Sequence, residues 1–370
     1  MRILKPLLFI LLIFLVALSV SACGAGQPTA VPTKVLDLSN TEASVQQIAY
    51  APKEFLDSNV VSAFDEFTDL SILEQNYSTD NELVSAVESR SGKFSFVVAS
   101  NYAASLMIEK GLLAPLNLDN IPNVAKLNDR FRNLDYDPGN QYCIPFTWGI
   151  IGIGYVNGQN ITPSNWGDLF QANPGSPAFG RMTILDHPRE AIAAALIHLG
   201  YSLNTTNDAE VLEAKQLILA NADRFDSLNS LSYGEQLANF QILLAQGWSR
   251  DFLYMQEVNP EVNFAIPQEG GLLRIYSFCI PEANTIGNKE AAEAFINLTL
   301  DNEWVASSVF NFQMPTTSKT ADDLIALNTR NNPLIYPPED VPNQSQYVYS
   351  LGNFELVYQN AWEEIQAAIP

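Results

Sequence analysis

The chain has 370 residues, of which 47% are hydrophobic, and its 19 basic and 41 acidic residues give a formal net charge of −22. This length predicts about two domains, or one large two-lobed one, with enough apolar side chains for proper cores. The acidic balance argues against a nucleic-acid-binding role, because phosphates require a basic protein face. It fits either a solvated acidic surface or a role in attracting cations.

Residues 1–22 predict an export signal. Arg2 and Lys5 make a short positive start, and the apolar run 7–20 follows them. A membrane-spanning helix needs about 20 apolar residues, so this shorter run is typical of a secretion signal. No later apolar run approaches that length. We therefore expect the rest of the chain to lie outside the membrane.

The end of this segment, Val20-Ser21-Ala22-Cys23, resembles a bacterial lipobox. The resemblance implies that Cys23 is lipidated and becomes the first residue of the mature protein. Residues 23–40 are rich in Gly, Pro, Thr and Ala without periodicity, which predicts a flexible tether. We expect an exported protein, either lipid-anchored at the outer face of the bacterial cytoplasmic membrane or periplasmic, and attached to the membrane only through this lipid.

Strand and helix patterns then alternate. Strands are predicted over 45–50, 70–73 and 94–98, and helices over 60–67 and from the capping box Thr79-Asp80-Asn81-Glu82 onward. This alternation predicts right-handed parallel units in an α/β fold. Ser100-Asn101-Tyr102 follows one strand at its carboxyl end, where open α/β sheets place ligands. A helix N-cap with no ligand contact explains Ser100 or Asn101 equally well.

The apolar stretch 144–157 contains Pro145, Trp148 and three glycines. Because proline cannot donate a hydrogen bond inside a central strand, the stretch predicts a strand that breaks and resumes as a crossover between two lobes. A single buried strand with an edge kink is the alternative. Residues 272–281 predict a second long strand, which ends in Ile280-Pro281 and returns the chain to the first lobe.

Cys143 and Cys279 lie in similar settings, each followed by Ile-Pro. The export context permits a disulfide between them, and two buried free thiols are the alternative.

The second half of the chain continues the alternation. A helix is predicted over 191–199, with Pro188 in its first turn and Asp186 or His187 as its cap. Another helix is predicted over 233–245, closed by the glycine of the segment 246–251. Residues 355–368 predict a final amphipathic helix.

Signals for catalysis are poor. The chain has two histidines, His187 and His198, which are too far apart for a zinc helix of the HExxH type. There is no nucleophile elbow and no phosphate-binding loop. Residues 135–140 fit a turn better than a calcium loop, because a distal acidic ligand is missing. We therefore predict no enzyme, cofactor or metal. Carboxylates and aromatic rings at strand and helix ends instead suit an ammonium ligand.

Seven short segments, taken in their order along the chain, resemble the spermidine/putrescine-binding proteins of ABC importers. These segments are 97–102, 111–116, 144–149, 186–190, 247–251, 267–271 and 335–338. The resemblance implies the two-lobed type II periplasmic-binding-protein fold, in which each lobe is a mixed, mostly parallel sheet flanked by helices and crossing hinge strands join the lobes. We place lobe 1 at 41–146 plus 277–313, and lobe 2 at 147–276 plus 314–370.

The same resemblance implies the site. Ser100 and Tyr102 match ligand contacts of the first lobe, and Glu190 matches an amine-binding carboxylate. Trp248 matches a ring that lies along the polyamine, and Asp251 matches an acidic contact of the putrescine-type branch.

One segment and three positions depart from the family pattern. The segment 51–55 stands where the family has a first-lobe Trp-Ser-Asp-Tyr contact motif. Tyr276 and Arg274 stand on the returning strand, where the family has an aspartate two residues after an aromatic, and His187 stands at a position that is often acidic. Arg274 either faces the cleft, which favours a different amine or a ligand with a carboxylate, or points to solvent.

The sequence thus predicts a monomeric substrate-binding lipoprotein that captures a polyamine between two lobes and delivers it to an ABC permease. The alternatives are the same role for another ligand, such as an amino acid derivative, and a sensor that docks on a receptor.

Overall fold

The computed structural model describes residues 46–89, 94–171, 174–282 and 289–370. The predicted signal segment, the tether and Cys23 lie outside the described residues. Among the helices of the described ranges, none is long and apolar enough to cross a membrane.

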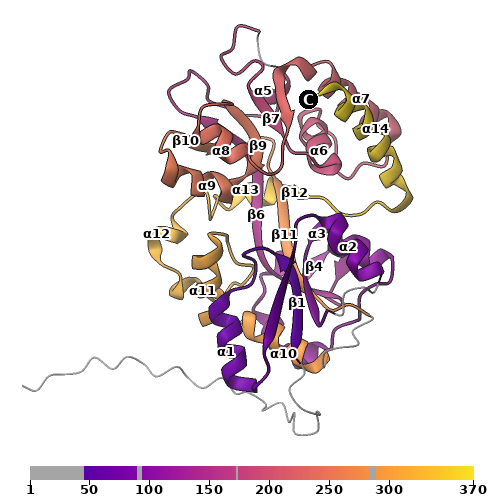
Figure 1. Ribbon diagram of the computed structural model, residues 1–370, viewed down its shortest axis with the longest axis vertical. Coiled ribbons are helices and arrows are strands. Elements are labelled where there is room, and N and C mark those ends of the chain that lie inside the picture. Colours follow the sequence, from indigo (N-terminus) through magenta and orange to yellow (C-terminus); the bar gives the residue numbers. More distant parts are fainter. Residues whose placement is uncertain (1–45, 90–93, 172–173, 283–288) are drawn as a thin grey trace, which may run out of the picture. The chain divides into compact units, whose positions relative to one another are not determined.

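Strands from both halves of the chain join one sheet (Figure 1). The strands are β1 (Gln47–Pro52), β2 (Ile72–Tyr77), β3 (Phe96–Ser100), β6 (Cys143–Val156), β7 (Met182–Ile184), β8 (Phe225–Leu228), β9 (Leu244–Trp248), β10 (Val262–Ala265), β11 (Leu272–Cys279) and β12 (Gln346–Tyr347). Within the described ranges their order is β2-β1-β3-β11-β6-β9-β7-β8, with β10 beside β6 and β12 beside β11. A separate small pair consists of β4 (Asn133–Leu134) and β5 (Asp137–Pro138).

Helices connect these strands. The α-helices are α1 (Ser58–Thr68), α2 (Asp80–Glu88), α3 (Asn101–Glu109), α4 (Asp129–Arg132), α5 (Gly167–Phe170), α6 (Pro188–His198), α7 (Asp208–Leu219), α8 (Tyr233–Ala238), α9 (Ser249–Val258), α10 (Lys289–Thr299), α11 (Asn302–Phe312), α12 (Leu327–Arg330), α13 (Asp340–Gln344) and α14 (Glu355–Ala368). Short 3₁₀ helices are η1 (Leu118–Asn120), η2 (Pro122–Lys126), η3 (Ala222–Arg224), η4 (Asp322–Leu324) and η5 (Gly352–Phe354). The caps predicted at Thr79 and His187 are confirmed, since each side chain accepts a backbone N–H of the first helical turn.

The sheet is parallel on both flanks and antiparallel in its middle. β2, β1 and β3 run parallel to one another, as do β9, β7 and β8. Between these groups lie β11 and β6, which pair with each other and with their outer neighbours in antiparallel fashion. Parallel α/β units on each side of two long connecting strands are the two-lobed α/β architecture that the sequence predicts.

The prediction that the strand of residues 144–157 breaks and resumes is wrong. β6 is continuous over 14 residues, and it is buried along nearly its whole length. Its register with β11 steps from Thr147 to Pro145, so that Phe146 forms a bulge. A bulge is a place where a central strand tolerates a residue without an N–H, so it accommodates Pro145 and pairing continues on both sides.

The predicted helix over 233–245 is too long. α8 ends at Ala238, Phe240 adopts a left-handed φ of 58°, and Leu244–Trp248 form β9 between β6 and β7. A short apolar run fits a buried strand as well as a buried helix, and here sheet pairing decides between them. The segment 246–251 therefore ends a strand and begins α9, which places Trp248 at the carboxyl end of a strand.

Apolar side chains divide into separate cores. One large cluster draws on residues between 151 and 272 and on the chain end from 348 to 369. Two others draw on residues between 49 and 146 and between 276 and 314. Two smaller clusters join residues from both sides of the predicted lobe boundaries, which stay a prediction.

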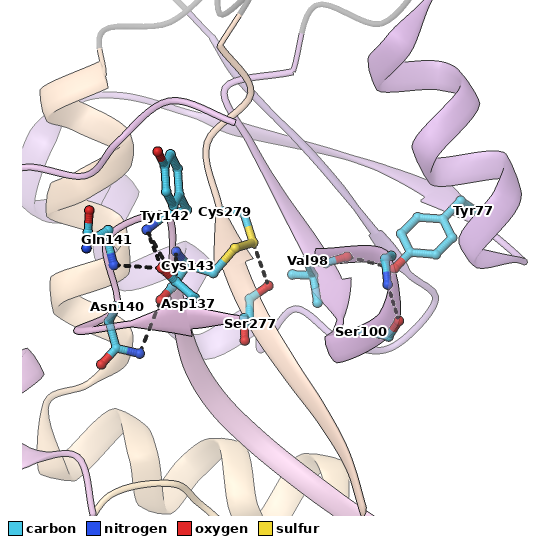
Figure 2. The surroundings of a disulfide bond; sticks show 11 residues. Tyr77, Val98, Ser100, Asp137, Asn140, Gln141, Tyr142, Cys143, Ser277 and Cys279 are labelled. Carbon is cyan, nitrogen blue, oxygen red and sulfur yellow. Dashed lines mark hydrogen bonds between the residues drawn. A yellow bond between two sulfur atoms is a disulfide. The ribbon is translucent and has the colours of Figure 1, made fainter. Parts of the chain in front are cut away.

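A disulfide joins the ends of the two connecting strands, which decides between the two alternatives for the cysteines. Cys143 on β6 and Cys279 on β11 are direct register partners, with Cα atoms 4.4 Å apart (Figure 2). Beside them, the Asp137 carboxylate accepts backbone N–H groups of Gln141, Tyr142 and Cys143. Burial raises the pKa of Asp137, and these hydrogen bonds oppose the rise. Asp137 therefore closes a turn, as the sequence favours.

Candidate functional site

Three helix N-termini and one central strand carry the predicted site residues. Ser100 ends β3 and caps α3, Glu190 lies in the first turn of α6, and Trp248 ends β9 directly before α9. Arg274 and Tyr276 are two residues apart on β11, so their side chains project from the same face of the sheet. Negative side chains are favoured at such helix starts, because unpaired N–H groups point outward there.

The guanidinium of Arg274 bridges two carboxylates. Its Nη1 donates to Oε1 of Glu190 at 2.8 Å, and its Nη2 donates to Oδ2 of Asp80 at 3.2 Å. The side chains of Arg274, Glu190 and Asp80 are only 18%, 10% and 6% exposed. Arg274 thus faces the protein interior, and the alternative that it points to solvent is wrong.

Two aromatic rings flank the same cation. The guanidinium carbon of Arg274 lies 5.0 Å from the centre of the Trp248 ring and 5.7 Å from that of Tyr276. The two rings are themselves 6.0 Å apart. Each contact lies within the range of cation–π attraction. We call Asp80, Glu190, Trp248, Arg274 and Tyr276 the arginine cluster.

Electrostatics keep Arg274 charged and Tyr276 neutral. Burial alone would lower the pKa of Arg274, but Glu190, Tyr276 and Asp80 outweigh burial and hold it above its usual value. Burial raises the pKa of Tyr276 to about 12, against the opposing effect of Arg274. Tyr276 therefore keeps its hydroxyl proton at neutral pH, and the cluster holds one strong cation.

Ser100 combines two roles. Its Oγ accepts the backbone N–H of Ala103 at 3.1 Å, as the capping interpretation predicts. It also donates to Oδ2 of Asp80 at 2.7 Å, on the oxygen that Arg274 contacts. Since Ser100 is fully buried, its hydroxyl serves to position Asp80. A direct ligand contact of Ser100 stays a prediction.

Tyr102 and His187 lie together beside the cluster rather than in it. Their rings meet edge to face with centres 5.7 Å apart. The hydroxyl of Tyr102 donates to Glu355 at 3.4 Å, and Nδ1 of His187 accepts the backbone N–H of Glu190 at 3.4 Å. Burial raises the pKa of Tyr102, and Glu355 adds to that rise. His187 thus orients the turn that carries Glu190.

Trp248 and Asp251 are linked through Tyr233. The Tyr233 hydroxyl accepts the backbone N–H of Trp248 at 3.2 Å and donates to Oδ2 of Asp251. Gly149 packs beside the indole: a Cβ atom there would lie 3.4 Å from the Trp248 ring and, more tightly, 3.2 Å from Met314. The Asp251 carboxylate is therefore engaged by Tyr233, while Trp248 faces Arg274.

The structure brings together Glu190, Trp248, Arg274 and Tyr276 from the predicted set. Sequence reasoning missed Asp80, Tyr233 and Phe55, whose ring centre lies 4.2 Å from that of Tyr276. A signal for Asp80 existed, because it follows a predicted strand at the start of a helix, where α/β proteins bind ligands.

No group of three or more His, Cys, Asp or Glu side chains that could hold a metal ion occurs in the part of the chain that the structure describes.

Comparisons with known proteins show the family of the chain. Residues 59–325 match the family model described as bacterial extracellular solute-binding protein. The putrescine-binding periplasmic protein SpuD of Pseudomonas aeruginosa is 29% identical over 344 residues, covering 88% of this chain and 90% of that protein. The spermidine/putrescine-binding periplasmic protein of Escherichia coli is 24% identical over 319 residues, with coverage of 85% and 89%.

Solved structures share the fold. The spermidine/putrescine ABC transporter substrate-binding protein PotD from Streptococcus pneumoniae superposes with a TM-score of 0.78 at 21% identity, covering 88% of this chain and 99% of that one. The TpPotD lipoprotein of Treponema pallidum gives a TM-score of 0.78 at 22% identity, with coverage of 87% and 99%.

Proposed function

Because the chain belongs to the bacterial extracellular solute-binding proteins, we propose that it captures a small amine of the polyamine class between its lobes and delivers it to the permease of an ABC importer. Membership in this family makes it a solute-binding protein rather than an enzyme, as the sequence predicts. It works outside the cytoplasm, as the family description states.

The observation that carries the ligand class is the convergence of two carboxylates and two aromatic rings on one cation. Asp80 and Glu190 hold the Arg274 guanidinium, and Trp248 and Tyr276 flank it. An ammonium group loses its hydration when it enters a cleft, so it needs this combination of negative charge and ring faces. The relatives from Pseudomonas aeruginosa and Escherichia coli, which are putrescine-binding and spermidine/putrescine-binding proteins, support the same class.

Capture would use a hinge motion about β6 and β11. Asp80 and Ser100 come from the predicted lobe 1, whereas Glu190 and Trp248 come from the predicted lobe 2. A ligand that touches both groups of residues binds the closed form better than the open form, and this difference drives closure. The disulfide between β6 and β11 ties one end of the hinge strands together.

Arg274 favours one alternative within the same role. The positive charge of Arg274 already compensates part of the negative charge of Asp80 and Glu190, which a polyamine would otherwise use. A ligand with fewer positive charges, such as an amino acid derivative, fits this balance and would be delivered by the same route.

Attachment to the membrane is part of the proposal. Lipidation of Cys23 would tether the folded domain through residues 23–40, and the domain would act as a monomer. The disulfide supports an oxidising location outside the cytoplasm.

A thermal-shift panel tests the ligand class. Purified protein lacking residues 1–22 is melted with putrescine, spermidine, spermine or single amino acids. A ligand at about 100 times its dissociation constant adds roughly 2.7 kcal/mol of stability, so a true ligand raises the midpoint clearly. If no amine raises it, the polyamine assignment is wrong. If only amino acids do, the alternative replaces it.

A further inference from the structure

The arginine cluster has a charge balance that suits one ammonium group. Asp80 and Glu190 bring two negative charges and Arg274 one positive charge, which leaves one negative charge to compensate. Arg274 uses only one oxygen of each carboxylate. Oδ1 of Asp80 and Oε2 of Glu190 accept no hydrogen bond within the described ranges. Neither oxygen is among the buried side-chain atoms that have no partner, so both are accessible to solvent.

Arg274 cannot easily leave this position. It lies on β11, which is paired with β6 on one side and with β3 and β12 on the other. Its guanidinium is held by two charge-assisted hydrogen bonds and two ring contacts. The cation is therefore a fixed part of the cluster.

Other carboxylates nearby are already engaged. Tyr233 donates to Asp251, and Arg189 pairs with Glu355. Glu54 is largely exposed and contacts Arg250. A second ammonium group close to the cluster would thus have to compete with an existing partner.

From this balance we propose that Arg274 is a specificity-determining residue: a resident cation that takes the place of one ammonium group of the ligand. The carboxylates of Asp80 and Glu190 then hold one ammonium group of the ligand. The site prefers an amine that carries one positive charge in total over a diamine or a triamine. This inference rests on the proposed amine-binding function and narrows its ligand from polyamines to amines that carry one positive charge.

The test compares two ligands of equal length, putrescine and 4-amino-1-butanol, in which a hydroxyl replaces one ammonium. Calorimetry gives the ratio of their dissociation constants for the wild type and for Arg274→Gln. We expect the wild type to bind 4-amino-1-butanol at least as tightly as putrescine. In Arg274→Gln, the affinity for putrescine relative to that for 4-amino-1-butanol should increase by at least about tenfold, because the net charge of the site becomes more negative by one unit.

A double variant guards against misfolding of the single one. Asp80→Asn combined with Arg274→Gln removes one charge of each sign, so it avoids two facing carboxylates without a counter-ion. In this double variant, the ratio of the two dissociation constants should return toward the wild-type ratio. The matched control is Lys110→Gln, which removes the same charge from a surface pair with Glu88. This control should leave the ratio unchanged.

The outcomes separate the two levels of the proposal. If putrescine binds the wild type far more tightly than 4-amino-1-butanol, and Arg274→Gln does not change the ratio, the resident-cation inference is wrong while amine binding stands. If putrescine binds only the Arg274→Gln variant, the inference is supported and the polyamine assignment fails. If neither ligand binds any of the proteins, the proposed function fails and takes the inference with it.

Discussion

Arg274 on β11 donates a hydrogen bond of 2.8 Å to Glu190 in the first turn of α6, across 84 residues of sequence. This contact joins the central strand β11 to α6, the helix that follows β7 in the sheet flank of β9, β7 and β8. It also places Arg274, a predicted departure from the family pattern, at the centre of the arginine cluster.

Glu190→Gln should weaken amine binding by roughly tenfold to a hundredfold. The amide can still accept a hydrogen bond from Arg274, but it offers no charge to a ligand ammonium, and charged hydrogen bonds are worth about 1.5–3 kcal/mol. Calorimetry measures the change. Glu364→Gln, which alters an exposed pair with Lys215, is the matched control. Unchanged affinity in Glu190→Gln would move the site away from the arginine cluster.

Replacement of Trp248 should affect amine affinity, whereas replacement of Trp148 should affect folding stability. Trp248→Ala should reduce amine affinity by several-fold or more, because it removes a cation–π partner worth about 1–2 kcal/mol. Trp148 is buried and donates from Nε1 to the Thr316 carbonyl at 3.0 Å, so Trp148→Ala should cost about 3–5 kcal/mol of folding stability. Calorimetry and urea unfolding measure the two effects. Equal loss of affinity in a folded Trp148→Ala protein would contradict this division.

Removal of the disulfide should destabilise the protein. The bond closes a loop of 136 residues, and loops of that size correspond to about 4–5 kcal/mol in the chain-entropy account. The double variant Cys143→Ala and Cys279→Ala should therefore unfold at lower urea concentration than the wild type. Reductant should lower the wild-type midpoint and leave the variant unchanged. Equal midpoints for oxidised and reduced wild type would refute the stabilising role.

Asp251 should make stability depend on pH. Burial raises the pKa of its carboxyl, and the hydrogen bond from Tyr233 opposes this rise only in part. The folded protein thus holds the proton more tightly than the unfolded chain, whose aspartates titrate near pH 4. This contribution to stability is fully present below about pH 4 and is lost as the pH rises through the folded pKa.

Urea unfolding at a series of pH values checks this. The difference in unfolding free energy between wild type and Asp251→Asn should shrink or reverse as the pH increases from about 4 to about 7. Parallel curves for the two proteins would show that the Asp251 carboxyl is not held in its neutral form.

Local patterns predicted much of the framework around the site. The capping roles of Thr79 and His187, the final helix and the long strand predicted after residue 272 all appear in the structure. Each depends on residues within a few positions of one another. Where two local explanations were equally good, the prediction failed or stayed open, as for the residues that became β9.

The sequence by itself determined the α/β class, the strand and helix order along most of the chain, and the residue types from which an amine site can be built. Hydrophobic periodicity, capping and turn chemistry are local, so they are present in the sequence. Only the tertiary structure decided that Arg274 meets both Glu190 and Asp80, which lie 84 and 194 positions away. Contacts between such distant residues depend on sheet order and register, because these decide which side chains share one face and how near their charges come.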